Sequence, residues 1–263
     1  MKIKETATII SQEKLCRDVY SMWISTMAAS GAEPGQFVSV YTNSEARLLP
    51  RPISICETDK TKEPGMIRLV YRVAGEGTKE FSQMTAGDRL EILGPNGNGF
   101  PAAVREEIRP DTRALLIGGG IGIPPMLQLA KELKCDVTVV AGYRTAGDMF
   151  LTKELEQYSK LYVATDDASC GYGGTVTAAV RSLGIKTDII FACGPRPMLA
   201  GVKDLAAEMD VPAYVSMEER MACGIGACLG CVCDSVEKDE HLQVNKKRVC
   251  VEGPVFSVSE VRL

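Results

Sequence analysis

Three closely spaced cysteines near the C-terminus constrain this chain more than any other feature of its sequence. Cys223, Cys228 and Cys231 follow a C-x4-C-x2-C pattern, and Cys250 lies further along the chain. Plant-type [2Fe-2S] clusters are held by four thiolates with this spacing. Glycines interleaved with the cysteines let the loop curl tightly and turn its backbone N–H groups toward the cluster sulfurs. The spacing therefore predicts an iron-sulfur centre and an electron-transfer function.

Two simpler explanations of the cysteines are a structural zinc site and disulfide bonds. Zinc ribbons usually contain two C-x2-C knuckles, whereas this chain has one, preceded by a four-residue gap. Disulfides are typical of small secreted domains, and 263 residues are enough to bury a core without them. The fourth ligand is open between Cys250 and Cys233. Cys250 is preferred, because neighbouring thiols on a tight stretch cannot all reach the same pair of metal ions.

Composition and charge argue against several classes of function. With 30 basic and 34 acidic residues the net charge is -4, which gives no general attraction to nucleic acid or anionic membranes. No run of apolar residues approaches the roughly 18 needed to span a membrane, and the N-terminus alternates like a strand rather than a signal peptide. Ten cysteines fit a reducing compartment. We therefore expect a cytoplasmic protein that binds neither nucleic acid nor membranes. The single histidine, His241, is expected to be an exposed loop residue.

The pattern of apolar residues and turns along the sequence changes near residue 100. Before that point, short alternating runs separated by Gly, Pro and polar turns predict a small antiparallel β-barrel, with strands near 20–27, 36–41, 53–57 and 66–73. After it, strands alternate with helices, which favours a mostly parallel sheet covered by helices. The expected strands there are 113–117, 136–142, 160–165 and 188–192, and the expected helices are 124–133, 152–159, 176–183 and 197–209.

The last part of the chain, from about residue 218, is rich in cysteine and glycine and too short to fold without its metal. The sequence therefore predicts a fold of β-barrel plus α/β class with a small C-terminal [2Fe-2S] subdomain. The expected boundaries are 1–101 for the barrel domain, 102–217 for the α/β domain and 218–263 for the cluster-binding subdomain.

Two turns in the α/β region have the pattern of nucleotide-binding loops. The first follows a buried strand and opens a helix, and its glycines are Gly118, Gly119, Gly120 and Gly122. A helix N-terminus supplies free N–H groups for a phosphate, and glycines let the ligand approach the backbone closely. The second turn, Cys193-Gly194-Pro195, also follows an apolar strand, so it lies at the same edge of the sheet, where open α/β folds bind ligands.

Two stretches of the barrel region place a basic side chain close in sequence to a hydroxyl, and the second also leads into a predicted helix. One is Arg51-Pro52-Ile53-Ser54, in which the arginine is suited to clamp a pyrophosphate and the serine to hydrogen-bond the edge of a flavin ring. The other begins with Val70-Tyr71-Arg72 and continues to Gly77 and Thr78, where Thr78 is expected to be the N-cap of a helix from Lys79 to Met84.

Taken together, these motifs resemble flavoproteins of the ferredoxin-reductase type. More narrowly, Glu219-Arg-Met-Ala-Cys-Gly-Ile-Gly-Ala-Cys228 and Val249-Cys-Val-Glu-Gly-Pro-Val-Phe256 resemble the electron-transfer subunits of class 1B bacterial dihydroorotate dehydrogenases, and the resemblance spans essentially the whole chain. The segment between Cys231 and Cys250 is somewhat longer than in that family, and Cys233 is an extra thiol.

The resemblance implies FAD held between the barrel and the α/β domain, a [2Fe-2S] cluster, NAD as the electron acceptor and a separate FMN-bearing catalytic subunit. It also implies a heterotetramer with two copies of each subunit and a role in the synthesis of pyrimidine nucleotides. The implied flavin contacts are Arg51, Pro52, Ile53, Ser54, Val70, Tyr71, Arg72, Gly77 and Thr78, and the implied cluster ligands are Cys223, Cys228, Cys231 and Cys250.

Three questions stay open at this point. A reductase subunit that serves another partner, of the NAD(P)H:ferredoxin or sulfide type, shares the same architecture. A cluster-based redox sensor is an alternative of another class. The choice of NAD over NADP rests on the resemblance alone, because Arg144, at the end of a predicted strand, is also suited to contact a 2′-phosphate.

Overall fold

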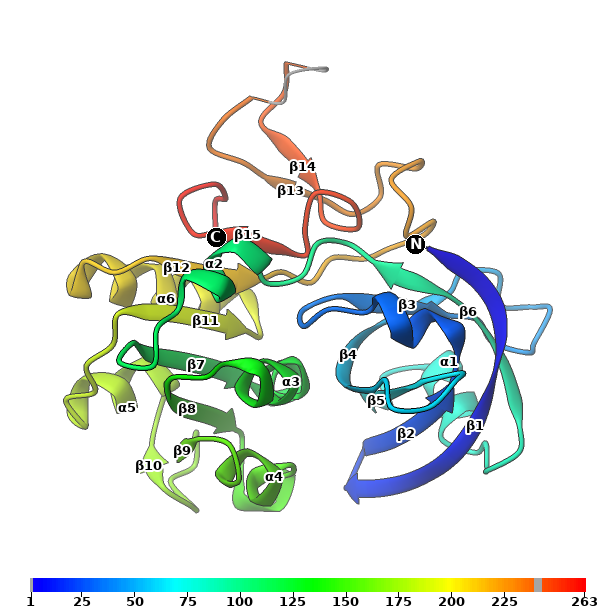
Figure 1. The fold of residues 1–263 in the computed structure, drawn as a ribbon, viewed down its shortest axis with the longest axis horizontal. Helices are drawn as coiled ribbons and strands as arrows, with labels where there is room; N and C mark the ends of the chain where they lie inside the picture. Colours follow the sequence, from blue (N-terminus) through cyan, green and yellow to red (C-terminus); the bar gives the residue numbers. More distant parts are fainter. Residues whose placement is uncertain (1, 239–242) are drawn as a thin grey trace.

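The computed structural model describes residues 2–238 and 243–263; His241 lies outside these residues. Figure 1 shows a barrel on the right, an α/β domain on the left and a small cysteine-rich part above them. The predicted antiparallel barrel is confirmed, and six strands close it in the order β1-β2-β5-β4-β3-β6. Their bounds are β1 (Ile3–Cys16), β2 (Val19–Ser25), β3 (Phe37–Val40), β4 (Arg51–Asp59), β5 (Met66–Arg72) and β6 (Arg89–Asn96).

Alternation along the strands separates the inside of the barrel from its outer face. In β3, Val38 and Val40 point into the barrel core, whereas Phe37 joins a different core that contains three buried cysteines of the C-terminal part. Successive side chains of a strand point to opposite faces, so Ser39 lies on the same outer face as Phe37. The outer face of β3 is therefore turned toward the C-terminal part.

Two short helices complete the barrel, a 3-10 helix (Met27–Gly31) and α1 (Glu76–Phe81). The prediction for α1 was wrong at its start, because its N-cap is Gly75 and Thr78 lies one turn into the helix. The Thr78 hydroxyl reaches back and accepts hydrogen bonds from the backbone N–H groups of Ala74, at 2.9 Å, and Gly75, at 3.2 Å. This places the helix start three residues earlier than the side chain alone suggests.

The α/β domain contains a seven-stranded sheet in the order β10-β9-β8-β7-β11-β12-β15. All neighbouring strands are parallel except β12 and β15, which confirms a mostly parallel sheet. The strands are β7 (Arg113–Gly119), β8 (Asp136–Tyr143), β9 (Lys160–Thr165), β10 (Tyr172–Gly173), β11 (Ile189–Cys193), β12 (Ala213–Ser216) and β15 (Val255–Ser257). The last of these belongs to the C-terminal segment and adds an antiparallel edge strand.

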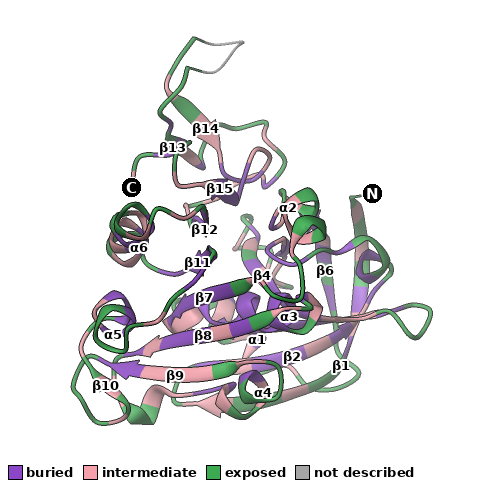
Figure 2. Cartoon of the chain, turned by 60° about the vertical axis from the view of Figure 1, so that its left-hand side comes forward, coloured by how far each residue is buried: buried purple, intermediate pink, exposed green. Residues whose placement is uncertain are grey.

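Helices cover both faces of this sheet. They are α2 (Ala102–Glu107), α3 (Pro124–Glu132), α4 (Thr152–Glu156), α5 (Val176–Ser182) and α6 (Arg196–Met209), with short 3-10 turns at Gly120–Gly122 and Ala146–Asp148. In the central strand β7, Leu116 packs with α3 and α4, and Leu115 packs with α5 and α6 on the other face. Figure 2 shows the buried residues concentrated in β7, β8 and β11. A strand buried on both faces explains the continuous apolar run in its sequence.

Helix α3 joins the barrel to the α/β domain. Its buried side chains share one core with Val19, Cys56 and Val70 of the barrel strands. In the C-terminal part, β13 (Val232–Asp234) and β14 (Lys246–Arg248) form a small antiparallel sheet. None of the helices in the described residues is long and apolar enough to cross a membrane.

Candidate functional site

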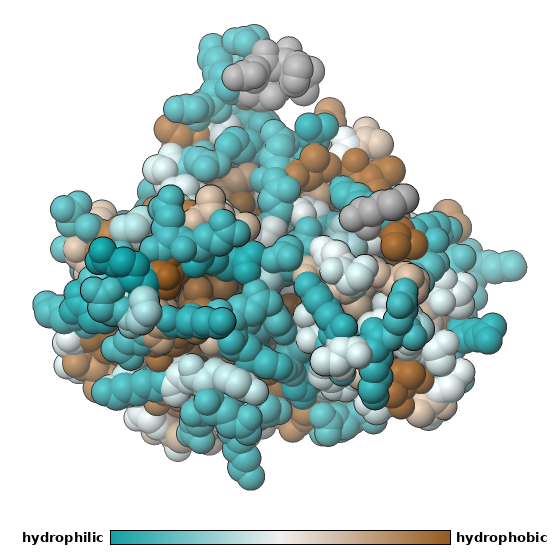
Figure 3. Space-filling model, in the orientation of Figure 1, coloured by the Kyte–Doolittle hydropathy of each residue, from teal (hydrophilic) through white to brown (hydrophobic). Residues whose placement is uncertain are grey.

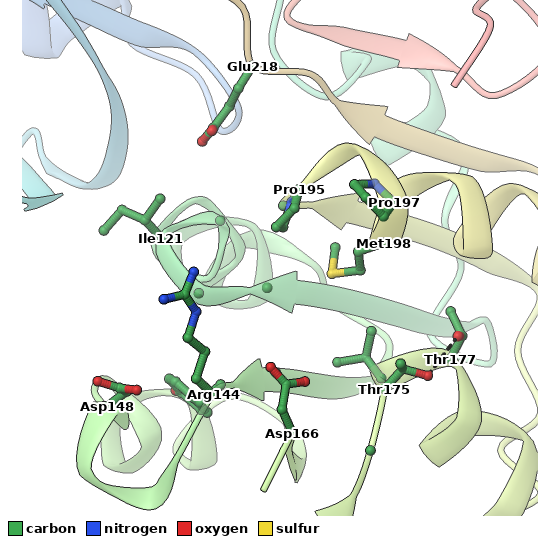
Figure 4. Close-up of a pocket in the computed structure, with 18 of the residues that line it drawn as sticks. Ile121, Arg144, Asp148, Asp166, Thr175, Thr177, Pro195, Pro197, Met198 and Glu218 are labelled. Carbon is green, nitrogen blue, oxygen red and sulfur yellow. Dashed lines mark hydrogen bonds between the residues drawn. The ribbon is translucent and has the colours of Figure 1, made fainter. Parts of the chain in front are cut away.

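A cavity of about 450 Å³ opens at the carboxyl ends of the parallel strands (Figure 4). Open α/β sheets bind ligands at this edge, and the volume is in the range of cofactor sites. Both predicted nucleotide-binding turns contribute to it, together with the barrel residue Arg72; the predicted residues that line it are Arg72, Gly119, Gly120, Gly122, Gly194 and Pro195.

The two turns are packed directly against each other. A Cβ atom added to Gly122 would lie 2.2 Å from the backbone oxygen of Cys193, so only glycine fits there. Gly118 and Cys193 do not line the cavity. Gly118 packs against Ile123, and the Cys193 side chain is 1% exposed. Burial and the nearby Glu218 carboxyl raise the pKa of Cys193 to about 12, so its thiol stays protonated at neutral pH.

The structure also brings together polar residues that sequence reasoning missed. They come from the ends of β8 and β9, the start of α5 and the segment after β12, and comprise Asp148, Asp166, Thr175, Thr177 and Glu218. Arg144, at the end of β8, points into the same cavity (Figure 4). The position of Asp166 directly after a parallel strand is a signal that the sequence contains. No local pattern marks Glu218, whose carboxyl has a pKa raised by burial.

In the barrel, β4 and β5 pair over only part of their length, and the unpaired stretch between them is here called the slot. The pairing of the two strands ends at Ile55 and Leu69, although both strands continue beyond these residues. The continuations are Arg51–Ser54 and Val70–Arg72, the two stretches that the sequence singled out. In this region β4 pairs with β3, and β5 with β2, which leaves the facing backbone groups of both strands for a ligand.

The side chains along this slot have different surroundings. Val70 and Tyr71 are 2% and 3% exposed and pack into two different cores, so only their backbone groups face a ligand. Ile53 is 7% exposed and also packs in the barrel core. Arg72 lines the cavity of the α/β domain near Gly120. The slot and the cavity are therefore adjacent.

Arg51 lies over the start of α1. Its guanidinium is so close to Gly77 that a Cβ atom there would lie 2.5 Å from the Nε atom of Arg51. Its Nη1 donates to the backbone oxygen of Leu49. A guanidinium beside a glycine at a helix start is a typical arrangement for binding a phosphate group.

The four predicted cluster ligands lie as two pairs of thiols. Cys228 donates a hydrogen bond to the Cys223 sulfur, and Cys250 donates one to the Cys231 sulfur. The Ile225 N–H donates to the Cys223 Sγ at 3.5 Å, and the Gly230 N–H donates to the Cys228 Sγ at 3.4 Å. Burial opposes ionisation of Cys223, but the backbone donors of the loop outweigh it and lower the pKa of this thiol to about 6.

This donor set fits a cluster with two irons, because each iron needs two thiolates and the thiols are associated two by two. Within the described ranges, no group of three or more His, Cys, Asp or Glu side chains is arranged to hold a single metal ion. Cys233 lies on β13 opposite Lys247. Burial and the Glu219 carboxylate raise the pKa of Cys233 to about 11, and this thiol shares a buried core with Cys231 and Cys250.

Comparisons with protein-family models match the three parts in order. Residues 6–100 match the oxidoreductase FAD-binding domain, residues 116–204 the oxidoreductase NAD-binding domain, and residues 218–262 the iron-sulfur cluster binding domain of dihydroorotate dehydrogenase B. Solved structures agree with the fold. The chain superposes with a TM-score of 0.83 and 32% identity on a chain of the NADH-dependent reduced ferredoxin-NADP oxidoreductase, covering 97% of this chain and 89% of that one. The chain also superposes on a ferredoxin reductase in carbazole 1,9a-dioxygenase with a TM-score of 0.66 and 21% identity. The superposition covers 81% of this chain and 69% of that one.

Curated relatives are similar over almost their whole length. The electron transfer subunit of dihydroorotate dehydrogenase B (NAD(+)) from Listeria monocytogenes is 42% identical over 259 residues, covering 97% of each chain. The protein of the same name from Geobacillus kaustophilus is 40% identical over 265 residues, covering 99% of each chain. With the cysteine pairs, the slot and the cavity on one chain, these similarities show that it belongs to the family of electron transfer subunits of NAD+-dependent dihydroorotate dehydrogenase B.

Proposed function

We propose that this chain links an FMN-containing dihydroorotate dehydrogenase subunit to NAD+, using a bound [2Fe-2S] cluster and FAD, in the de novo synthesis of pyrimidine nucleotides. The observation that carries this proposal is the presence on one chain of paired thiols, unpaired ends of β4 and β5 and a cavity at the edge of the α/β sheet, with the last two adjacent at Arg72. When bound, flavin and cluster together supply the conversion between two-electron and one-electron transfer.

The residues divide this work among the three parts. We assign the cluster to 218–263 with Cys223, Cys228, Cys231 and Cys250 as ligands, FAD to the barrel (1–101) and NAD to the α/β domain (102–217). Arg51, Gly77 and Thr78 bind and orient the pyrophosphate of FAD at the start of α1. The strand ends Arg51–Ser54 and Val70–Arg72 hold the flavin ring, and the glycine turns hold NAD beside it. The buried thiol of Cys193 packs beneath the second turn and does not contact NAD.

The catalytic subunit docks where the cysteine loop reaches the surface. Cys228 is exposed, and its neighbours Ile225 and Leu229 are apolar and about half exposed, at 51% and 50%. Figure 3 shows brown patches in the upper part of the molecule, where the cysteine-rich part lies. Apolar side chains around a metal site that must approach a second cofactor are typical of an interface. We propose a heterotetramer of two copies of each subunit. We place it in the cytoplasm, where the ten cysteines, none of which forms a disulfide, stay reduced.

The experiment that tests the function is dihydroorotate-dependent NADH formation by this chain purified with its FMN subunit, compared with each subunit alone. Activity only in the mixture is the expected result. Failure of the two subunits to associate, or acceptance of electrons by NADP+ alone, would contradict the proposal.

Cys228→Ser tests the route of the electrons. The variant is expected to lose dihydroorotate-dependent NADH formation, because the thiol pair with Cys223 is broken, and to keep NADH-dependent dye reduction through FAD. Cys233→Ser is the matched control and should retain the [2Fe-2S] absorption and full coupled activity. Unchanged coupled turnover in Cys228→Ser, or loss of the cluster in Cys233→Ser, would show that the ligand assignment is wrong.

A second candidate is a reductase subunit of a ferredoxin-NADP system. The observation that favours it is the TM-score of 0.83, at 32% identity, to a chain of such an oxidoreductase. Preference for NADP(H) over NAD(H) in steady-state dye reduction would support this candidate. A redox sensor would differ from both. Stoichiometric FAD that NADH bleaches rapidly would indicate an enzyme and would argue against the sensor.

A further inference from the structure

A buried polar pair lies between the flavin slot and the cysteine loop. Ser39 on β3 is 1% exposed and Asn96 at the end of β6 is 0% exposed. The Asn96 Nδ2 donates to the Ser39 Oγ at 3.3 Å and to the backbone oxygen of Leu93 at 2.6 Å. On its other side, β3 pairs Ser39 with Pro52, within the strand end that we assign to the flavin.

The cysteine loop rests directly on this pair. Gly224, the residue after Cys223, approaches Ser39 so closely that a Cβ atom on Gly224 would lie 2.7 Å from the Ser39 Oγ. Gly224 also has a φ of +67°, in the left-handed region that favours glycine. In Figure 1 the segment that follows β12 crosses to the barrel side near β6 before it returns to β13. A residue of the barrel is thus in contact with the loop that holds the cluster.

The hydrogen bonds of this pair are incomplete within the described residues. The Asn96 amide uses its nitrogen as a donor twice, while its Oδ1 is a buried side-chain oxygen without a hydrogen-bond partner. Ser39 accepts a hydrogen bond, and no acceptor for its own hydroxyl hydrogen is found in the described part of the chain. Buried polar groups are rarely left without partners. The Asn96 oxygen can only accept a hydrogen bond and so cannot bond a sulfur atom, whereas the Ser39 hydroxyl hydrogen needs an acceptor, which a group bound from outside the chain can supply.

The Ser39 hydroxyl lies at the contact between the barrel and the cysteine loop. Its oxygen accepts a hydrogen bond from Asn96 and lies close to Gly224, so its hydrogen can turn toward an acceptor beside that loop. The acceptors that a [2Fe-2S] cluster brings to this loop are its sulfur atoms. We propose that Ser39 donates a hydrogen bond to a sulfur of the cluster at or beside Cys223, and that Asn96 fixes its orientation. This inference rests on the proposed cluster site.

The consequence is a higher reduction potential for the cluster. Reduction adds negative charge to the sulfurs, so a donor that faces them stabilises the reduced form more than the oxidised form. A hydrogen bond to a charged group is worth about a tenfold change in an equilibrium. For a one-electron couple, a tenfold change corresponds to about 59 mV.

The test is an EPR-monitored redox titration of the complex with its FMN subunit, with FAD and cluster in place. Ser39→Ala is expected to shift the ratio of reduced to oxidised cluster about tenfold toward the oxidised form at a fixed potential, while the FAD midpoint stays the same. Ser39→Thr, which keeps the hydroxyl, should restore most of the shift. The matched control is Ser21→Ala, which removes another buried hydroxyl of the barrel, bonded to the Arg68 Nε at 2.9 Å, and should leave the cluster potential unchanged.

If Ser39→Ala does not retain the cluster, Ser39→Cys is used instead, because a thiol is a weaker hydrogen-bond donor of similar size. The midpoint potential of its cluster is expected to be lower than that of the wild type. A wild-type midpoint in whichever of these two variants retains the cluster would overturn the inference while leaving the proposed function intact. Absence of any [2Fe-2S] signal from the wild-type complex would instead overturn the cluster site itself, and with it this inference.

Discussion

At the scale of single residues, the nucleotide site depends on how closely two backbone turns approach. Gly122 and Cys193 come from different strands, and the space between them excludes even a methyl group, since a Cβ atom would lie 2.2 Å from the Cys193 oxygen. Neither turn can yield easily, because each is fixed by a buried strand, β7 or β11. The positions of the two predicted nucleotide-binding turns are thus coupled through one glycine.

Gly122→Ala is therefore expected to force the turns apart. Overpacking in a well-packed region costs about 1–3 kcal/mol, and we expect roughly tenfold weaker binding of NAD+, with a matching loss of stability. The control is Gly147→Ala in the same domain, where an added Cβ atom meets only the Thr145 hydroxyl oxygen, at an ordinary distance of 3.6 Å. NAD+ titration and urea unfolding of both variants measure the effects. Equal affinities would show that the turns are not coupled.

At the scale of elements, the flavin slot is produced by two strands that stop pairing. Beyond Ile55 and Leu69, β4 and β5 follow different neighbours, and the twist of a closed barrel separates them. Helix α1 follows β5 and places Gly77 under the Arg51 guanidinium. The proposed anion site is therefore built from a strand start and a helix start that are held by the barrel.

Arg51→Gln tests this arrangement. A hydrogen bond to a charged group contributes about 1.5–3 kcal/mol, so its loss should weaken FAD binding roughly tenfold or more. Arg47→Gln is the matched control, because Arg47 lies in the same loop region but pairs with Glu80 at 2.6 Å and Glu76 at 3.6 Å. The measurement is FAD dissociation followed by flavin fluorescence. Comparable affinities for the two variants would argue against Arg51 as a phosphate ligand.

At the scale of the whole molecule, a buried ionic network fixes the barrel against the α/β domain. Glu57 of β4 bonds Arg68 of β5 at 2.7 Å and Lys131 of α3 at 2.8 Å. Arg68 is 6% exposed and also lies 3.5 Å from Glu154 of α4. The network thus ties β4 and β5 of the barrel to α3 and α4 of the α/β domain, and we expect it to hold the two domains in position.

Glu57→Gln is expected to destabilise the protein by about 3 kcal/mol, since it leaves two cations near each other without their shared carboxylate. It should also slow hydride exchange between NADH and FAD. Glu33→Gln is the control, because Glu33 joins Arg105 across the same pair of domains but is half exposed, and surface pairs contribute about 1 kcal/mol or less. Urea unfolding and stopped-flow flavin reduction provide the two measurements. A loss no larger than that of the control would show that the network does not bind the domains together.

The sequence by itself determined the features that depend on short spacings. The cysteine motif, the glycine turns after apolar strands and the alternation of the barrel strands all act within a few residues, so the fold class and the pieces of each site were predictable. Tertiary packing decided what distant segments do to one another. It turned β15 into an edge strand of the α/β sheet and brought Glu218 to the cavity and Ser39 under Gly224. These contacts depend on side-chain packing across the whole molecule, which no local spacing encodes.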